Sequence, residues 1–170
     1  DCYVPIMTNM YGGKLIEHEL LGDTKKEKAV FGELHSIESY MKHREAVEFV
    51  KSHQRGDPFN PSRFFPKSLV DGIKKDQEIG LSPGDQIAFY TAINSPLDRY
   101  HGVDAFFDLK VGTKTVIVTI DVTTNPSKDR YKADVILAIP EEGLDPKDQD
   151  YKHNINNYVD QIRSNILTKI

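Results

Sequence analysis

The sequence predicts a mixed α/β (α+β) domain with a small central sheet flanked by helices, and three patterns carry that prediction. Residues 103–123 alternate in polarity around Gly112-Thr113, a pair typical of two-residue hairpin loops. Residues 133–140 read ADVILAIP, an aliphatic run with the length of a buried strand. In the last 20 residues apolar positions recur at helical spacing, so we expect the chain to end in a helix.

The hairpin is the most informative element because its turn fixes its register. With a two-residue loop, one face of the paired strands carries only apolar side chains, out to Val103 opposite Val122. On the other face the same counting places Asp104 directly opposite Asp121. Directly opposed side chains have Cβ atoms about 4.5–5.5 Å apart, and like charges at that distance destabilise a sheet. The pair therefore requires compensation.

Three kinds of compensation suit two opposed carboxylates: a shared proton, a neighbouring cationic side chain, or a bound metal ion. A divalent ion such as Mg²⁺ or Mn²⁺ fits the geometry, because Mg²⁺ takes one or two protein carboxylates and completes its shell with waters and substrate phosphate oxygens. The alternative is that Asp104 and Asp121 sit exposed at the strand ends and bind nothing.

Helical patterns account for most of the remaining chain. Apolar spacing predicts a long amphipathic helix over residues 36–53 beginning at Ser36, and a shorter one over 67–77. Ser82, Pro83 and Asp85 together form a strong start signal for a helix over 82–93. The expected order is helices, then three strands, then a final helix.

Length and composition bound the classes of protein to consider. At 170 residues the chain is expected to form a single domain, 1–170, and its net charge of −4 argues against bulk electrostatic coating of nucleic acid. The one cysteine, Cys2, excludes an internal disulfide and a cysteine-rich zinc site, which favours a reducing, cytoplasmic setting. No apolar run has the length of a membrane span, so we expect no membrane partner.

The segments HGVDAFF and TVIVTIDVT, within an order of helix, three strands and helix, resemble the PD-(D/E)XK nuclease superfamily. The resemblance covers residues 82–170 as a restriction-endonuclease-like core and leaves 1–80 as an N-terminal helical elaboration. It places Asp104 at the family's first acidic position and Asp121 at the second. It implies a magnesium-dependent endonuclease or related hydrolase that binds DNA or RNA.

The resemblance also assigns roles to residues around the pair. Thr123 stands two residues after Asp121, where the family pattern has a lysine, and Lys128 on the adjoining turn is the candidate to supply that charge. The family often adds an acid from the preceding helix, for which Asp85 is the candidate metal ligand. His101, just before the strand, is a candidate substrate contact, together with Thr123.

Three functional hypotheses follow from these residues. The first is a metal-dependent phosphodiester hydrolase in which Asp104 and Asp121 hold the ion and Lys128 orients the nucleophile. The second is a nuclease-like scaffold without catalysis that binds nucleic acid or protein, which Thr123 favours. The third is a toxin domain of a larger secreted protein, suggested by a first residue, Asp1, that is not Met; it would require a cognate immunity protein.

Overall fold

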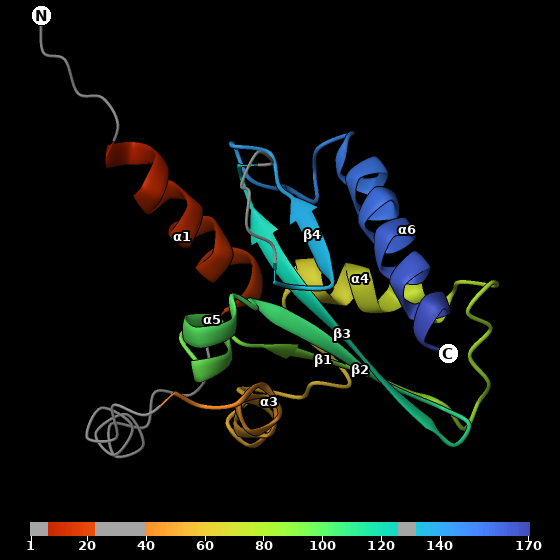
Figure 1. Ribbon diagram of the computed structural model, residues 1–170. Coiled ribbons are helices and arrows are strands. Elements are labelled where there is room, and N and C mark those ends of the chain that lie inside the picture. Colours follow the sequence, from red (N-terminus) through yellow and green to blue (C-terminus); the bar gives the residue numbers. More distant parts are fainter. Residues whose placement is uncertain (1–6, 23–39, 126–131) are drawn as a thin grey trace, which may run out of the picture.

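The computed structural model describes residues 7–22, 40–125 and 132–170, which form a mixed α/β fold (Figure 1). Its elements, in chain order, are α1 (Met7–Leu21), α3 (His43–Ser52), α4 (Phe64–Lys74), β1 (Gln86–Thr91), α5 (Pro96–His101), β2 (Ala105–Val111), β3 (Lys114–Thr123), β4 (Val135–Ala138) and α6 (Tyr151–Lys169).

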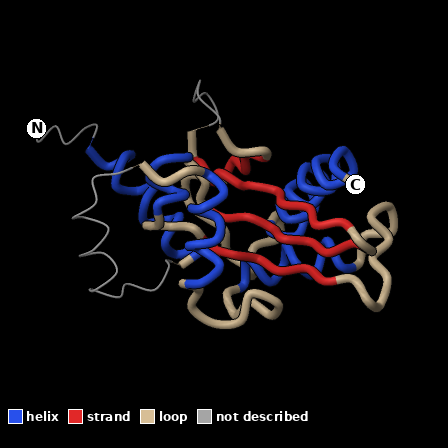
Figure 2. The backbone as a smooth tube through the Cα atoms, turned by 60° about the horizontal axis from the view of Figure 1, so that its bottom comes forward, coloured by secondary structure: helices blue, strands red, loops and turns tan. Residues whose placement is uncertain are grey.

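The strands form one sheet in the order β1-β2-β3-β4 (Figure 2). Strands β1, β2 and β3 are an antiparallel meander, and β4 lies parallel to β3. The sheet is therefore mixed, as predicted. The buried strand predicted within 133–140 is β4, and its side chains alternate between buried and more exposed positions.

Helices cover both faces of the sheet (Figure 1). One face packs with α1, α4 and α6 into a continuous apolar core that contains Leu20, Phe65, Phe107 and Ile162. The other face packs with α3 and α5 into a smaller core that contains Phe106. Because α1 and α4 share the main core with the strands, the N-terminal helices are part of the same hydrophobic unit as the sheet.

The hairpin has the predicted register. Ala105 pairs with Ile120, and the strands meet at the expected two-residue loop. The predicted pairing of Val103 with Val122 is wrong, because β2 begins only at Ala105. Val103 lies in the smaller core beside α3 and α5, whereas Val122 lies in the main core, so the chain crosses from one face to the other at this point.

The helix predicted over 82–93 is wrong, because these residues supply a turn followed by β1. The residues that resemble a helix start close the turn instead: Asp85 N–H donates to the Ser82 carbonyl at 2.9 Å, and Ser82 N–H donates to the Asp85 carboxylate at 2.8 Å. The other oxygen of Asp85 accepts the N–H of Gly112 in the hairpin loop at 2.9 Å. The apolar strand sequence QIAFYT then pairs along β2.

The other predicted helices are present with shifted ends. The long N-terminal prediction corresponds to α3, which begins at His43 and ends at Ser52, while Ser36 lies outside the described residues. The second corresponds to α4, and the C-terminal helix is α6. None of the described helices is both long enough and apolar enough to cross a membrane.

Strand β1 is an outer strand of the sheet, and the segment after α3 lies along its free edge. The side chain of Gln54 donates to the Thr91 carbonyl at 2.8 Å and accepts the Thr91 N–H at 3.1 Å. The Phe89 N–H donates to the carbonyl of Pro58 at 2.9 Å. This segment therefore satisfies main-chain groups that no strand pairs on that side.

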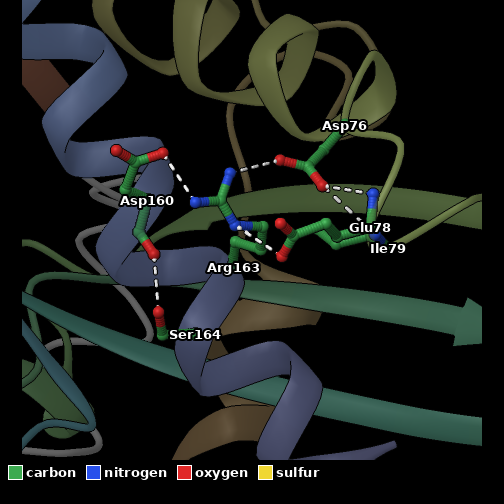
Figure 3. Close-up of polar contacts among 6 residues, drawn as sticks. All are labelled: Asp76, Glu78, Ile79, Asp160, Arg163 and Ser164. Carbon is green, nitrogen blue, oxygen red and sulfur yellow. Dashed lines mark hydrogen bonds and ion pairs between the residues drawn. The ribbon is translucent and has the colours of Figure 1, made fainter.

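A network centred on Arg163 fastens α6 to the turn after α4 (Figure 3). Its guanidinium contacts the carboxylates of Asp76 at 2.9 Å, Asp160 at 2.9 Å and Glu78 at 3.4 Å. Asp76 also accepts the N–H groups of Glu78 and Ile79. Burial alone would raise the pKa of Asp76, but Arg163 and these amides outweigh it and lower that pKa.

Replacing Arg163 with Gln should destabilise the fold, because it leaves the Asp76 carboxylate, whose side chain is only 7 % exposed, without its cation. We expect a loss of about 1–3 kcal/mol in the free energy of unfolding, measured by urea denaturation. Lys152→Gln, on an exposed position of the same helix, is the matched control and should change it little. Equal losses in both variants would contradict a special role for the network.

Candidate functional site

Asp104 occupies the junction where the chain enters the sheet between α5 and β2. Its N–H donates to the Ile120 carbonyl on β3 at 2.8 Å, and its carbonyl accepts the N–H of Ala92, just beyond β1, at 2.7 Å. Its carboxylate accepts the Val122 N–H at 2.7 Å. With 4 % of its surface exposed, Asp104 is buried at a point where three strand segments meet.

Asp121, on β3, lies beside Asp104 as the hairpin register predicts, and the two side chains are hydrogen-bonded to each other. A hydrogen bond between two carboxyl groups requires that one of them carries a proton. Burial first, then the negative charge of Glu17 and the contact with Asp121, raise the pKa of Asp104 to about 9, against the opposing effect of the Val122 N–H. In the absence of a cation the pair therefore holds a proton at neutral pH.

Glu17, on α1, is the site residue that sequence reasoning missed. Its charge reaches Asp104 because α1 packs its C-terminal turn, with Leu20 and Leu21 buried, against the main core. The sequence does contain a signal for this helix: Ile16 and Leu20 are four residues apart, and Gly22 follows with a φ of +68°, as is common just beyond a helix end.

A fourth acid, Asp98 on α5, lies in the same electrostatic field. Ser95 caps α5, since its side chain accepts the N–H groups of the next turn, and Asp98 accepts the Asn94 N–H at 2.9 Å. Burial raises the pKa of Asp98, Asp121 adds to that rise, and the positive charge of Lys14 on α1 opposes it. The end of the sheet thus concentrates carboxylates from three elements, with a lysine of α1 nearby.

The other predicted site residues are placed unevenly around the pair. Thr123 lies on β3 two residues beyond Asp121 and so on the same face, but its hydroxyl is engaged in a local turn with Asn125, at 3.0 and 3.2 Å. His101 donates from Nε2 to the Met41 carbonyl at 2.8 Å and packs its ring against α3 residues. Lys128 lies outside the described residues.

Asp85 is not brought to the pair. Asp85 precedes β1 and lies at the end of the sheet that carries the hairpin loop. Thr91, which pairs with Ala105 next to Asp104, is six residues further along the strand, or roughly 20 Å away. The backbone contacts of Asp85 lower its pKa, and they hold it at the opposite end of the hairpin. The acid that approaches the pair from a helix is Glu17 instead.

The residues present were tested against the requirements of a divalent ion. Among the residues that the structure describes, no three His, Cys, Asp or Glu side chains are grouped as a metal-binding set. Mg²⁺ commonly uses only one or two carboxylates, and Asp104 and Asp121 supply two hard oxygen donors in contact. The pair therefore fits a weakly held Mg²⁺ or Mn²⁺ whose remaining ligands are waters or substrate oxygens.

Comparison of the chain with protein-family models, with curated proteins and with solved structures finds no match in any of the three.

The shared proton predicts how stability depends on pH. The pKa of Asp104 is raised in the folded state, so protonation of Asp104 stabilises the fold. This stabilisation is fully present below the pKa of the unfolded chain, near 3.9, and is lost as pH rises towards about 9. Asp104→Asn keeps an acceptor for the Val122 N–H and removes the titration. Urea denaturation gives the free energy of unfolding at each pH between 5 and 9. Its decrease with pH should be less steep in this variant than in the parent, by up to about 1.4 kcal/mol per pH unit.

The matched control for that measurement is Asp148→Asn, an exposed acid in the loop before α6. It should reproduce the parent's slope. An Asp104→Asn variant whose stability falls with pH as steeply as the parent's would contradict a proton held at this pair.

Proposed function

We propose that the protein is a metal-dependent phosphodiester hydrolase that acts on DNA or RNA, in a reducing cytoplasmic setting. The observation that carries the proposal is the contact between Asp104 and Asp121, two acids that are mutually unfavourable unless a proton or a cation lies between them. The pair is fixed by main-chain hydrogen bonds at the end of the sheet.

The chain's own groups have defined tasks in this proposal. When Mg²⁺ or Mn²⁺ is bound, it supplies charge stabilisation at the scissile phosphate and a more acidic water. Asp104 must release its proton to become a ligand, so affinity for the ion rises with pH up to the pKa of the pair. The negative charge of Glu17 acts on the pair, so it favours binding of a cation there. It also disfavours binding of a phosphate unless a cation is bound as well.

The resemblance to the PD-(D/E)XK superfamily supports the same function. It calls for a helix acid near the two strand acids, and Glu17 on α1 has that relation to Asp104. It also calls for a lysine, for which Thr123 cannot substitute because a hydroxyl carries no charge. Lys128 remains the proposed source of that charge.

A nuclease-like scaffold without catalysis is the second candidate. One observation in its favour is the proton shared between Asp104 and Asp121, which removes their repulsion without any metal ion. Another is the Thr123 hydroxyl, which already hydrogen-bonds within a local turn. A scaffold would bind nucleic acid or protein but would show no cleavage with any divalent ion. The two candidates differ in metal affinity and in turnover.

Asp121→Asn should lower the affinity for Mn²⁺ at least about tenfold, because it removes one of two charged ligands. The metal-free variant should be as stable as the parent or more so, because the negative charge of Asp121 that acts on Asp98 is gone and the amide can still hydrogen-bond to Asp104. Isothermal titration with Mn²⁺ at pH 8, and thermal melts with and without it, test both parts. Asp148→Asn is the control of equal charge change, and unchanged Mn²⁺ affinity in Asp121→Asn would eliminate the site.

The lysine is tested by two substitutions, at residues 128 and 123. Lys128→Ala should abolish Mg²⁺-dependent cleavage of single-stranded or duplex nucleic acid while leaving Mn²⁺ affinity nearly unchanged, because a charge that acts in the transition state does not hold the ion. Adding Thr123→Lys should restore part of the activity. If the parent cleaves neither DNA nor RNA with either ion, the scaffold is correct; if Lys128→Ala cleaves normally, Lys128 has no catalytic role.

A further inference from the structure

A cavity of about 360 Å³ lies between the end of α1, the segment from Gln54 to Arg63, and the free edge of β1. Its walls include Leu21 and Gly22 from α1 and Phe89 and Thr91 from β1. The Thr91 hydroxyl donates to the Gly22 carbonyl at 2.8 Å, so α1 and β1 are joined at the cavity wall.

The cavity presents the guanidinium of Arg63. Arg63 donates from one terminal nitrogen to the Glu19 carbonyl at 2.8 Å, and within the described parts of the chain no carboxylate lies within ion-pair distance of it. Its side chain packs so closely on Gly22 that a Cβ there would come within 2.6 Å of Nε. This contact and the Glu19 bond hold the guanidinium in place, and its other N–H groups have no acceptor among the described residues.

Further donors line the same cavity. Arg55 also lines the cavity, but it has an interaction partner of its own. The main-chain N–H groups of Gly56 and Ser62 have no acceptor within the described residues. The opposing charge is Asp57, and one of its oxygens already accepts the Phe59 N–H at 2.9 Å. The Arg63 guanidinium and these two main-chain N–H groups therefore supply donors of the kind that bind a phosphate group.

Two elements connect this cavity to the carboxylates. Glu17 lies one helical turn before Leu21, a rise of about 6 Å along α1. Thr91 pairs with Ala105, the residue that follows Asp104. Figure 1 shows α1 ending against the sheet close to the start of β2. The cavity and the acid pair are therefore linked through α1 and β1, and a polynucleotide that spanned both would place different phosphates at them.

We propose that this cavity is a binding site for a backbone phosphate of a polynucleotide, held by Arg63 and flanking the phosphate at Asp104 and Asp121. The position relative to a cleaved bond rests on the proposed function, whereas the anion site itself stands on the cavity and its donors. The site takes a phosphodiester and reads no base, so it contributes affinity and register rather than sequence preference.

The test measures binding of a fluorescein-labelled 12-nucleotide single-stranded DNA to the full chain in EDTA, where no metal and no cleavage contribute. Arg63→Gln should raise Kd about tenfold, the effect of losing one charge-assisted hydrogen bond. It should also reduce the slope of log K against log salt by about 0.7. Lys67→Gln, an exposed lysine on α4 with the same charge change, is the control and should shift Kd far less.

Arg63 also caps the end of α1, so a second variant keeps the test independent of stability. Ser62→Asp leaves the Arg63–Glu19 bond intact and places a negative charge in the cavity, and it should weaken binding by a similar factor. Parent-like Kd in both Arg63→Gln and Ser62→Asp, or no binding by the parent, would overturn the proposal. Mn²⁺ titration of the same variants distinguishes the phosphate site from the proposed hydrolase site. Weaker DNA binding with unchanged Mn²⁺ affinity supports the phosphate site, whether or not the protein proves to be a hydrolase.

Discussion

The arrangement of this protein depends on how one buried residue, Asp104, is bonded. Its main-chain groups join β3 to the segment after β1, and its carboxylate takes the N–H of Val122. A side chain thus completes the ladder where β2 has not yet begun. Because these bonds fix the carboxylate, its contact with Asp121 follows from the sheet itself and not from a mobile loop. The close contact of two carboxyl groups, with its need for a proton or a cation, is therefore a consequence of the fold.

The acids of this protein fall into two groups according to how their charge is balanced. Asp76, Asp108 and Asp134 each face a cation on another element, at 2.9 Å from Arg163, 2.6 Å from Lys51 and 2.6 Å from Lys169 respectively. These pairs fasten helices to the sheet or to a neighbouring turn. At the end of the sheet the balance is reversed, because Glu17 of α1 and Asp121 of β3 act on Asp104 just before β2, and the pKa of Asp104 is raised. A strongly shifted pKa of this kind, with a specific charged neighbour, is common at functional sites.

Sequence reasoning was sufficient where structure follows from local pattern. The two-residue loop and the alternation along β2 and β3 fixed which residues face each other, and so placed Asp104 beside Asp121. It failed at Asp85, because the same residue types that cap a helix can close a turn, and the choice depends on a partner, Gly112, that is 27 residues away. It missed Glu17 and the Arg63 cavity because both arise from the packing of α1 on the sheet, which no local pattern encodes.

The segment along β1 has a consequence for how copies of this chain meet one another. An outer strand normally offers unpaired main-chain groups that a strand from a second molecule can join. At Thr91 both groups are taken by the amide of Gln54, and at Phe89 the N–H is taken by Pro58. An incoming strand would have to displace these bonds before it gained its own. The opposite outer strand, β4, is only four residues long. Edge-to-edge extension of the sheet is therefore disfavoured on both sides, and the molecule resists that route to aggregation.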